Sequence, residues 1–306
     1  MSARAERSPL ARQTLGQQLW GVAAGAGEFL RLLSARPVGL AGFLGILAFA
    51  FMAYLAPLFI PVQLTVDVTQ IYQGPSAAHP LGTDSSGRDV LNQIVHGGRD
   101  ILSIGFLAGA FSTLIAVTFG SFAAVVGGKI DALISGITDV VLTIPTFPLL
   151  VVLAALLRLN DLIFVALIIA LLAWPSLLRQ VRAQVLSLRE RDYVEAARSL
   201  DLGIVHVIFR EILPNMRSYI VIHFILAMTV SVYAIAGLIF LGIVPLSGNN
   251  WGIMINFAYV RGALFFKDSF WYIFSPILAI ALFQLSLVSF ASALEDIFNP
   301  RLRSHG

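Results

Sequence analysis

The 306-residue chain contains no cysteine and few charged residues. Without cysteine it can form neither a disulfide framework nor a cysteine-based metal site. Asp, Glu, Lys and Arg together make up 12% of the chain, about half of the ~25% that is usual in soluble domains. Hydrophobic residues make up 58%, and the mean hydropathy is +0.86. This composition indicates a protein that crosses a membrane several times.

Patterns typical of catalysis are also missing. The five histidines show no spacing typical of a metal site. The stretch from Gly127 to Lys129 has some likeness to a phosphate-binding loop, but Ala123 stands where its first glycine belongs and Ile130 where Ser or Thr belongs. No nucleophile with a neighbouring base is recognisable. The sequence therefore predicts no catalytic residue, metal or cofactor in this chain, and His223 is interpreted as a hydrogen-bonded packing residue.

Long uncharged runs predict six membrane spans. A helix needs about 20 apolar residues to cross a ~30 Å hydrocarbon core. The predicted spans are residues 38–60, 101–128, 132–157, 162–178, 218–244 and 270–294. The third is interrupted by Pro145 and Pro148, which leave backbone carbonyls without partners in the membrane and so require protein or water around them. Residues 245–268 are expected to form a loop or a half-inserted segment.

The connections between these spans are too short to hold another domain. The chain is therefore divided into an N-terminal tail (1–37), one all-α membrane domain (38–298) and a C-terminal tail (299–306). Residues 1–37 lack the apolar core and cleavage site of a signal peptide. Leu15 to Leu33 is weakly amphipathic, and two interpretations remain open: a disordered tail, or an interfacial helix that forms an elbow before the first span.

Lys and Arg are distributed unevenly between the two sides of the membrane. With the N-terminus in the cytoplasm, most of the 20 Lys and Arg residues lie on the cytoplasmic side. Such residues concentrate on that side in membrane proteins, so both termini are predicted to be cytoplasmic. Membrane topology thereby accounts for the basic pI of 9.4, and nucleic acid is not expected as a partner.

The segment 179–217, between the fourth and fifth predicted spans, is the longest polar stretch in the second half of the chain. Asp192 is predicted to cap a short helix, with Glu195 completing a capping box. Apolar residues then recur at helical spacing: Tyr193, Ala196, Ala197, Leu200 and Ile204. Gly203 is the expected helix stop, and a second short helix is expected to end before Pro214. A helix with one apolar face, held between membrane spans, is suited to docking on another protein.

Glu195-Ala196-Ala197, followed by Leu213-Pro214, resembles the "EAA" cytoplasmic loop of ABC-importer permeases. In that family the loop is a coupling helix that fits a groove on the ATPase subunit. The resemblance implies this role for residues 193–203, Arg198 and Leu200 among them. Asp201 stands where the family has glycine, so the helix is expected to run about half a turn further, towards Gly203.

The polar loop after the first predicted span contains His79 and then the pattern G-T-D-x-x-G-R-D. Its composition is typical of a solvated loop in which Asp84, Arg88 and Asp89 pair locally. The order of residues, however, resembles the signature of the C-type permease subunit of dipeptide and oligopeptide importers. The resemblance implies that the pattern braces the outer face of the permease. The residues concerned are Gly82, Thr83, Asp84, Gly87, Arg88 and Asp89.

Candidates for the substrate path are fewer. Asp139 is the main ionisable group inside a predicted span, where a carboxylate is costly without a cavity or a partner. It is interpreted as a path residue or interhelical pair, or as a group that reaches water at the cytoplasmic end. Pro145 and Pro148 are the second candidates. Trp251 lies in a stretch, Ser247 to Met254, that resembles another segment of the subfamily; it is expected to meet the binding protein, to cap the path or to anchor the interface.

The resemblance implies a type I ABC-importer permease fold with six transmembrane helices in a bacterial plasma membrane. It implies four kinds of partner: lipid, a second, non-identical permease subunit, two ABC ATPase subunits that hold ATP and Mg²⁺, and an extracytoplasmic solute-binding protein. The implied cargo is a di- or oligopeptide, with an oligosaccharide or a nickel complex as alternatives. A membrane enzyme would need a reactive constellation, and a passive channel would need a selectivity filter and no docking loop, so both are disfavoured.

Overall fold

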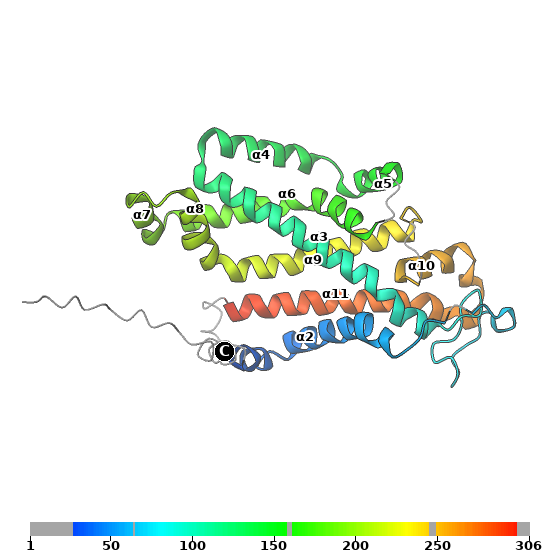
Figure 1. Ribbon diagram of the computed structural model, residues 1–306. Helices are drawn as coiled ribbons and strands as arrows, with labels where there is room; N and C mark the ends of the chain where they lie inside the picture. The colour runs from blue at the N-terminus through cyan, green and yellow to red at the C-terminus, as the bar shows by residue number, and fades with distance from the viewer. Residues whose placement is uncertain (1–26, 64, 158–160, 245–248, 299–306) are drawn as a thin grey trace, which may run out of the picture.

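The computed structural model describes residues 27–63, 65–157, 161–244 and 249–298. This part of the chain is almost entirely helical, as Figure 1 shows. Strand-like pairing within it is limited to one bridge between Thr83 and Asp89. The prediction of an all-α membrane protein is confirmed.

The elements follow one another along the predicted spans. α2 (Pro37–Ala50) continues through the π turn η1 (Phe51–Leu55) and the 3-10 turn η2 (Ala56–Leu58). After η3 (Val68–Gln70) come α3 (Val90–Val126), α4 (Gly128–Thr143), α5 (Thr146–Leu157), α6 (Leu162–Arg189), α7 (Asp192–Ser199) and α8 (Ile204–His206). The chain then forms η4 (Val207–Ile212), η5 (Leu213–Met216), α9 (Arg217–Phe240), α10 (Trp251–Val260), η6 (Ala263–Phe265), η7 (Lys267–Ser269) and α11 (Phe270–Phe298).

Five helical stretches of the described chain are long and apolar enough to cross a membrane, so the protein is a multi-pass membrane protein. The predicted third span is instead a pair of helices, α4 and α5, bent by 84°. The bend lies at Pro145, which has no N–H to continue the ladder of helical hydrogen bonds. Pro148 falls in the first turn of α5, where that loss costs little. A sixth crossing therefore requires the bent pair to cross as one.

Two helices extend well beyond the predicted spans. α3 begins at Val90, well before residue 101, because the Asp89 carboxylate accepts the N–H of Asn92 at 2.6 Å and caps the helix. α6 does not end with the apolar run at residue 178. It continues as a polar helix to Arg189, with Pro175 inside it.

The predicted tails lie mostly outside the described residues, which exclude 1–26 and 299–306. Residues 27–34 are helical. Leu33 is fully buried there, in a small apolar cluster with Ala293 and Ile297 at the end of α11. The described part of the predicted elbow is therefore a helix packed on the membrane domain.

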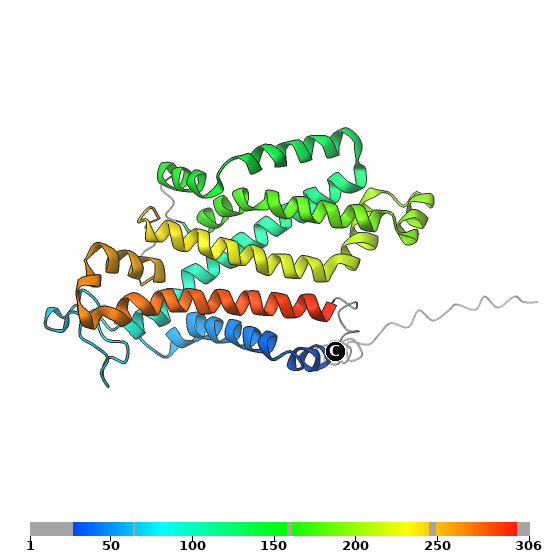
Figure 2. The ribbon, with the colours of Figure 1, turned by 180° about the vertical axis from the view of Figure 1, so that it is seen from behind.

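The helices form a flat bundle organised around α3. α3 packs against α6 and α9, and α11 packs against α2 and α9. Figures 1 and 2 show α2 and α11 along one edge of the bundle and α4 with α5 along the other. α7 and α8 project at one end, and the loop between η2 and α3 lies with α10 at the opposite end.

The indole of Trp251 fixes α10 to α3. It fills a notch made by two consecutive glycines of α3: a Cβ on Gly97 or Gly98 would lie 2.8 Å from the nearest indole atom. Its Nε1–H donates to the carbonyl oxygen of Ile94 at 2.9 Å, and the side chain is fully buried. The notch therefore requires glycine because the indole has no room to move.

Gly98→Ala should lower the free energy of unfolding by about 1–3 kcal/mol, the usual cost of overpacking a closed site. Gly136→Ala on α4 is the matched control, because a Cβ there meets nothing within 4 Å. The control should stabilise its helix by up to ~1 kcal/mol. Thermal unfolding of the detergent-solubilised protein measures both, and equal midpoints would contradict the notch.

Candidate functional site

α7 lies outside the spans and has two different faces. Val194 and Ala197 are buried, at 0% and 4% exposure, in an apolar cluster with residues of α6 and η4. The apolar residues on the exposed side are Tyr193, Ala196 and, directly after the helix, Leu200, which is 71% exposed; they lie among the exposed polar residues Asp192, Glu195, Arg198 and Ser199. The helix is therefore anchored by one side, and its other side is exposed.

This division corrects the single apolar stripe expected from the sequence. Ala197 was expected on the same face as Ala196, yet it turns inward with Val194, three positions before it. Ile204 is exposed but belongs to the next helix, α8. The exposed apolar surface of α7 is thus narrower than the sequence pattern indicated.

The start of α7 also differs from the prediction. Arg191 is the N-cap residue, and its side chain makes no capping hydrogen bond. Asp192 is already the first helical residue, so the expected capping box with Glu195 is wrong. Both carboxylates nevertheless lie in the first turn, where the helix dipole favours negative charge.

Asp201 ends the helix by itself. Its φ is +50°, in the left-handed region. Its N–H donates to the Arg198 carbonyl at 2.9 Å, and the Leu202 N–H donates to the Ala197 carbonyl at 3.3 Å. These two bonds form a Schellman motif. The expected extension to Gly203 is therefore wrong: α7 stops at Ser199, and Asp201 adopts the conformation that glycine adopts most readily.

Two arginines connect this region to the end of α3. Arg189 Nη1 donates to the carbonyl oxygen of Ala124 at 2.9 Å, and Arg198 Nη2 reaches that of Val125 at 3.4 Å. Carbonyls in the last turn of a helix have no partner within the helix and carry partial negative charge. Sequence reasoning missed these contacts, because the acceptors lie 65 or more positions earlier in the chain.

The chain after α7 is more continuous than predicted. The second short helix was expected to end before Pro214, but α8, η4, η5 and α9 follow without a break. Leu213 and Pro214 open the 3-10 turn η5, where proline needs no N–H partner. The continuous helical path into α9 therefore begins at α8, after the break that separates α8 from α7.

Asp139 forms the interhelical pair that was one of its interpretations. Its carboxylate lies 2.5 Å from Arg179 Nη2 on α6. A second pair joins the same two helices, because Arg182 Nε and Nη2 donate to Asp131 at 2.5 and 2.6 Å. These two pairs hold α4 against α6.

The other residues predicted to line the substrate path lie in separate parts of the structure. Pro145 and Pro148 lie exposed at the bend between α4 and α5. Trp251 is fully buried between α10 and α3, so its indole offers no free face for stacking. The structure does not bring these residues together with Asp139 into one cavity of the described chain.

The loop between η2 and α3, which the sequence predicts on the outer side and which is called the outer loop below, is organised around the buried carboxylate of Asp84. Its Oδ1 accepts the backbone N–H groups of Ser86 and Arg88 at 2.7 and 2.9 Å. Its Oδ2 accepts from Arg88 Nε at 2.9 Å and from Gln93 Nε2 at 3.0 Å. Asp84 is 0% exposed, so every one of these bonds replaces lost water.

The rest of the pattern shapes the loop around this carboxylate. Thr83 Oγ1 accepts the N–H of Gln73 at 2.8 Å and donates to the Gln70 carbonyl. Gly82 and Gly87 both have φ +74°, and a Cβ on either would collide with backbone. Gly87 packs on Asp67, whose pKa is held below its usual range by hydrogen bonds from Thr69.

Two further contacts join the loop to the bundle. Asp89, besides capping α3, lies 2.9 Å from His79 Nδ1. Arg261, after α10, donates to the hydroxyls of Ser85 and Ser86 at 2.8 and 2.9 Å. The pattern thus connects α3, the outer loop and the segment after α10.

Asp84→Ala should lower the free energy of unfolding by about 3–5 kcal/mol, because it leaves Arg88 and two backbone N–H groups without their acceptor. Asp268→Ala, an exposed carboxylate at the same end of the molecule, should change it by less than about 0.5 kcal/mol. Thermal unfolding measures both variants. Similar shifts would show that Asp84 does not organise the loop.

Asp201→Gly should stabilise the end of α7 by a few tenths to about 1 kcal/mol, because the left-handed conformation then loses its Cβ penalty. Asp201→Val should act in the opposite direction. Hydrogen exchange at the amides of Asp201 and Leu202 reports the change. Slower exchange in the valine variant would contradict the Schellman motif.

The sequence of the chain is similar to those of known proteins. Residues 116–304, more than half of the chain, match the family described as binding-protein-dependent transport system inner membrane component. A protein of Brucella suis biovar 1 that is named as a peptide permease is 33% identical over 257 residues, which cover 83% of each chain.

Two other relatives cover more of the chain. The dipeptide transport system permease protein of Alkalihalophilus pseudofirmus is 31% identical over 281 residues, 90% of each chain. The glutathione transport system permease protein of Pectobacterium atrosepticum is 32% identical over 282 residues, which cover 90% of this chain and 91% of its own. The chain belongs to the family of inner-membrane components of binding-protein-dependent transport systems.

Proposed function

We propose that this chain is one of two non-identical permease subunits of an ATP-driven importer in a bacterial plasma membrane. Its cargo is a di- or oligopeptide delivered by an extracytoplasmic binding protein. The family supports the binding-protein-dependent importer. The relatives named above are a peptide, a dipeptide and a glutathione permease, and glutathione is itself a peptide. None of these three names supports an oligosaccharide or a nickel complex as the cargo.

The proposal rests on one observation: α7 has one buried side and one exposed side. On its exposed side, Tyr193 and Ala196, with Leu200 directly after the helix, form an apolar patch among charged residues, and α7 projects beyond the bundle (Figure 1). An apolar helix face left in water is unfavourable and is typical of a docking site. We assign it to the ATPase subunits, which hold ATP and Mg²⁺ on the cytoplasmic side. The chain itself performs no hydrolysis.

The coupling mechanism follows from how α7 is held. Closure of the two ATPases around ATP moves the docked helix. Val194 and Ala197 are packed under α7, and Arg198 bonds to α3, so the displacement passes to α3 and α6 as a rigid unit. The spans then tilt between an inward-open and an outward-open arrangement, a two-state change biased by a distant ligand.

The importer is tested by co-purification with the products of the neighbouring genes. A tag on this chain should retain two ATPases and a second permease. In lipid, their ATP hydrolysis should rise when the binding protein is loaded with peptide. A chain that purifies without an ATPase would refute the docking role of α7, and stimulation by sugar alone would refute the peptide cargo.

Leu200→Asp should weaken retention of the ATPases by roughly 30-fold or more, because an unpaired carboxylate in an apolar groove costs about 2 kcal/mol or more. Leu264→Asp is the matched control: Leu264 is 65% exposed, at the other end of the molecule, and should leave retention unchanged. Ala197→Asp is unsuitable because Ala197 is buried and the variant would disturb the fold. Normal retention by Leu200→Asp would refute the proposed docking face.

A further inference from the structure

A groove of about 590 Å³ runs between α2 and α11, along the edge of the bundle that these two helices form (Figures 1 and 2). Its lining is mostly apolar, and the residues of its exposed rim are Val38, Ala41, Leu282 and Leu285. Sites of this volume hold ligands with a sizeable apolar part. The α2–α11 groove therefore has room for a hydrocarbon chain.

The floor of the groove is a close contact between the two helices. A Cβ on Gly42 would lie 2.7 Å from the carbonyl oxygen of Ser286, and a Cβ on Gly45 would lie 2.2 Å from the hydroxyl oxygen of the same residue. Neither glycine has a side chain that could fill the groove. Because α2 joins the bundle chiefly through α11, the groove lies beside the contact that holds α2 in place.

The groove is about as long as one leaflet of a bilayer is deep. It extends along α2 from Pro37 to Phe49, about 18 Å at 1.5 Å per residue. The hydrocarbon core of a bilayer is ~30 Å thick, so one leaflet accounts for about 15 Å. Pro37 is also the first residue of Pro37–Leu58, a stretch long and apolar enough to cross a membrane. The groove thus extends from one surface of the hydrocarbon core to near its middle.

The end of the groove at Pro37 carries one positive and one negative group. A cavity of about 260 Å³ adjoins the groove there and shares Pro37, Val38 and Ser289 with its lining. Arg36 and Asp296 face this cavity, with Arg36 Nη1 2.5 Å from Asp296 Oδ2 and side chains 41% and 39% exposed. Among the described residues, Arg36 Nε and Nη2 and Asp296 Oδ1 have no hydrogen-bond partner. Both groups can therefore bind a ligand without giving up their own pair.

Two opposite charges side by side are complementary to a zwitterion. A phosphate would bind the free N–H groups of Arg36, whose planar fork suits phosphate oxygens. An ammonium would bind the carboxylate of Asp296. A headgroup with only negative charge would instead meet that carboxylate without a compensating group. The charges at this end therefore favour a headgroup that carries a phosphate and an ammonium together.

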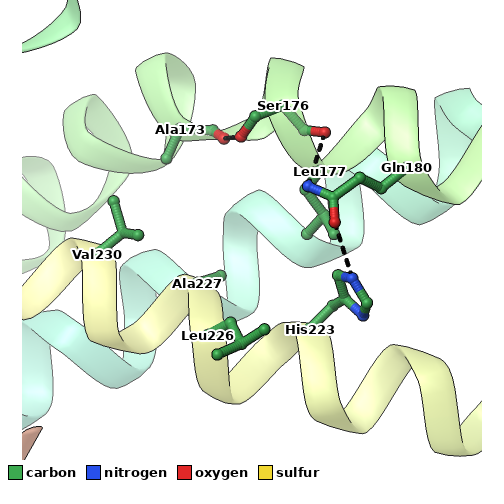
Figure 3. Close-up of a pocket in the computed structure, with 8 residues that line it drawn as sticks. All are labelled: Ala173, Ser176, Leu177, Gln180, His223, Leu226, Ala227 and Val230. Carbon is green, nitrogen blue, oxygen red and sulfur yellow. Dashed lines mark hydrogen bonds between the residues drawn. The ribbon is translucent and has the colours of Figure 1, made fainter. Parts of the chain in front are cut away.

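The cavity between α6 and α9 shares neither property with the groove (Figure 3). Its volume is about 110 Å³, which is small for a hydrocarbon chain. Its polar groups are already bonded within the chain: Gln180 Nε2 donates to the carbonyl oxygen of Ser176 at 3.2 Å, and Gln180 Oε1 lies 2.9 Å from His223 Nε2. The free charged groups thus distinguish the α2–α11 groove.

We propose that the α2–α11 groove is a binding site for one zwitterionic phospholipid, in the leaflet on the side that carries α7 (Figure 1). One acyl chain lies in the groove, the phosphate binds Arg36 and the ammonium binds Asp296. The lipid fills the open side of the contact between α2 and α11 and so helps to hold α2 on the bundle. This proposal requires only that the protein spans a membrane, so it does not depend on the cargo.

The position of the acyl chain is tested by photolabelling. The full chain is placed in lipid discs, alone and with the subunits that co-purify with it. The discs contain a phosphatidylethanolamine whose acyl chain carries a diazirine, and peptide mass spectrometry locates the adducts after irradiation. We expect adducts on residues 37–49 and 282–289, at a higher yield than on the exposed apolar residues of α4 and α5.

Ala41→Trp should lower labelling of the groove roughly fivefold or more, because the indole overfills the space that the acyl chain occupies. Leu47→Trp is the matched control and should leave labelling unchanged: Leu47 is 48% exposed and lies on the opposite side of α2 from the groove. An equal yield on all exposed helices, or labelling that ignores Ala41→Trp, would overturn the site. Labelling of the isolated chain that disappears in the complex would also overturn it, because another subunit would then fill the groove.

The headgroup is tested with a phosphatidylglycerol that carries the same photoactive chain but a net negative headgroup. The wild type should be labelled more by phosphatidylethanolamine. Asp296→Asn should shift the ratio towards phosphatidylglycerol roughly fivefold, the effect of one unit charge a few ångströms away in water. Glu295→Gln, an exposed neighbour that does not line the cavity, should leave the ratio nearly unchanged. Equal labelling of the wild type by both lipids, or a ratio that Asp296→Asn does not alter, would refute the zwitterionic headgroup.

Discussion

The contact on which the structure most depends is the one between the last carbonyls of α3 and the guanidinium groups of Arg189 and Arg198. An isolated helix of eight residues is unstable in water, so α7 exists only because its neighbours hold it. The buried side of α7 packs against apolar residues of its neighbours. The two arginines fix the orientation of this region relative to α3, because each guanidinium group donates to one particular carbonyl of α3. A helix held in this way can move only together with the helices that hold it.

The sequence predicted most of what depends on local pattern. Uncharged runs located the spans, and the close spacing of Asp84 and Arg88 indicated their pairing. The start of α3 and the stop of α7 could also have been found locally, from Asp89 as a cap and from the tolerance of aspartate for positive φ. Both were missed because the apolar run and the usual glycine were given more weight than these signals.

Contacts between distant segments could not be predicted from a single sequence. The face on which Ala197 lies depends on where α6 and η4 pass beneath α7, and no periodicity within eight residues specifies that. The burial of Trp251 depends on a glycine notch more than 150 positions earlier. His223 was interpreted as a hydrogen-bonded residue, which the structure bears out, but its partner Gln180 could not be inferred.

α3 connects the two ends of the molecule as a single helix of 37 residues, about 55 Å long at 1.5 Å per residue. One end is capped by the outer loop and the other is held beside α7. No proline interrupts it, so no missing N–H breaks its ladder of helical hydrogen bonds. A rotation of only about 5° about one end would displace the other by roughly 5 Å, given that length. A small change in the tilt of α3 beside α7 would thus be magnified at the far end of the helix, where α3 meets the loop that caps it.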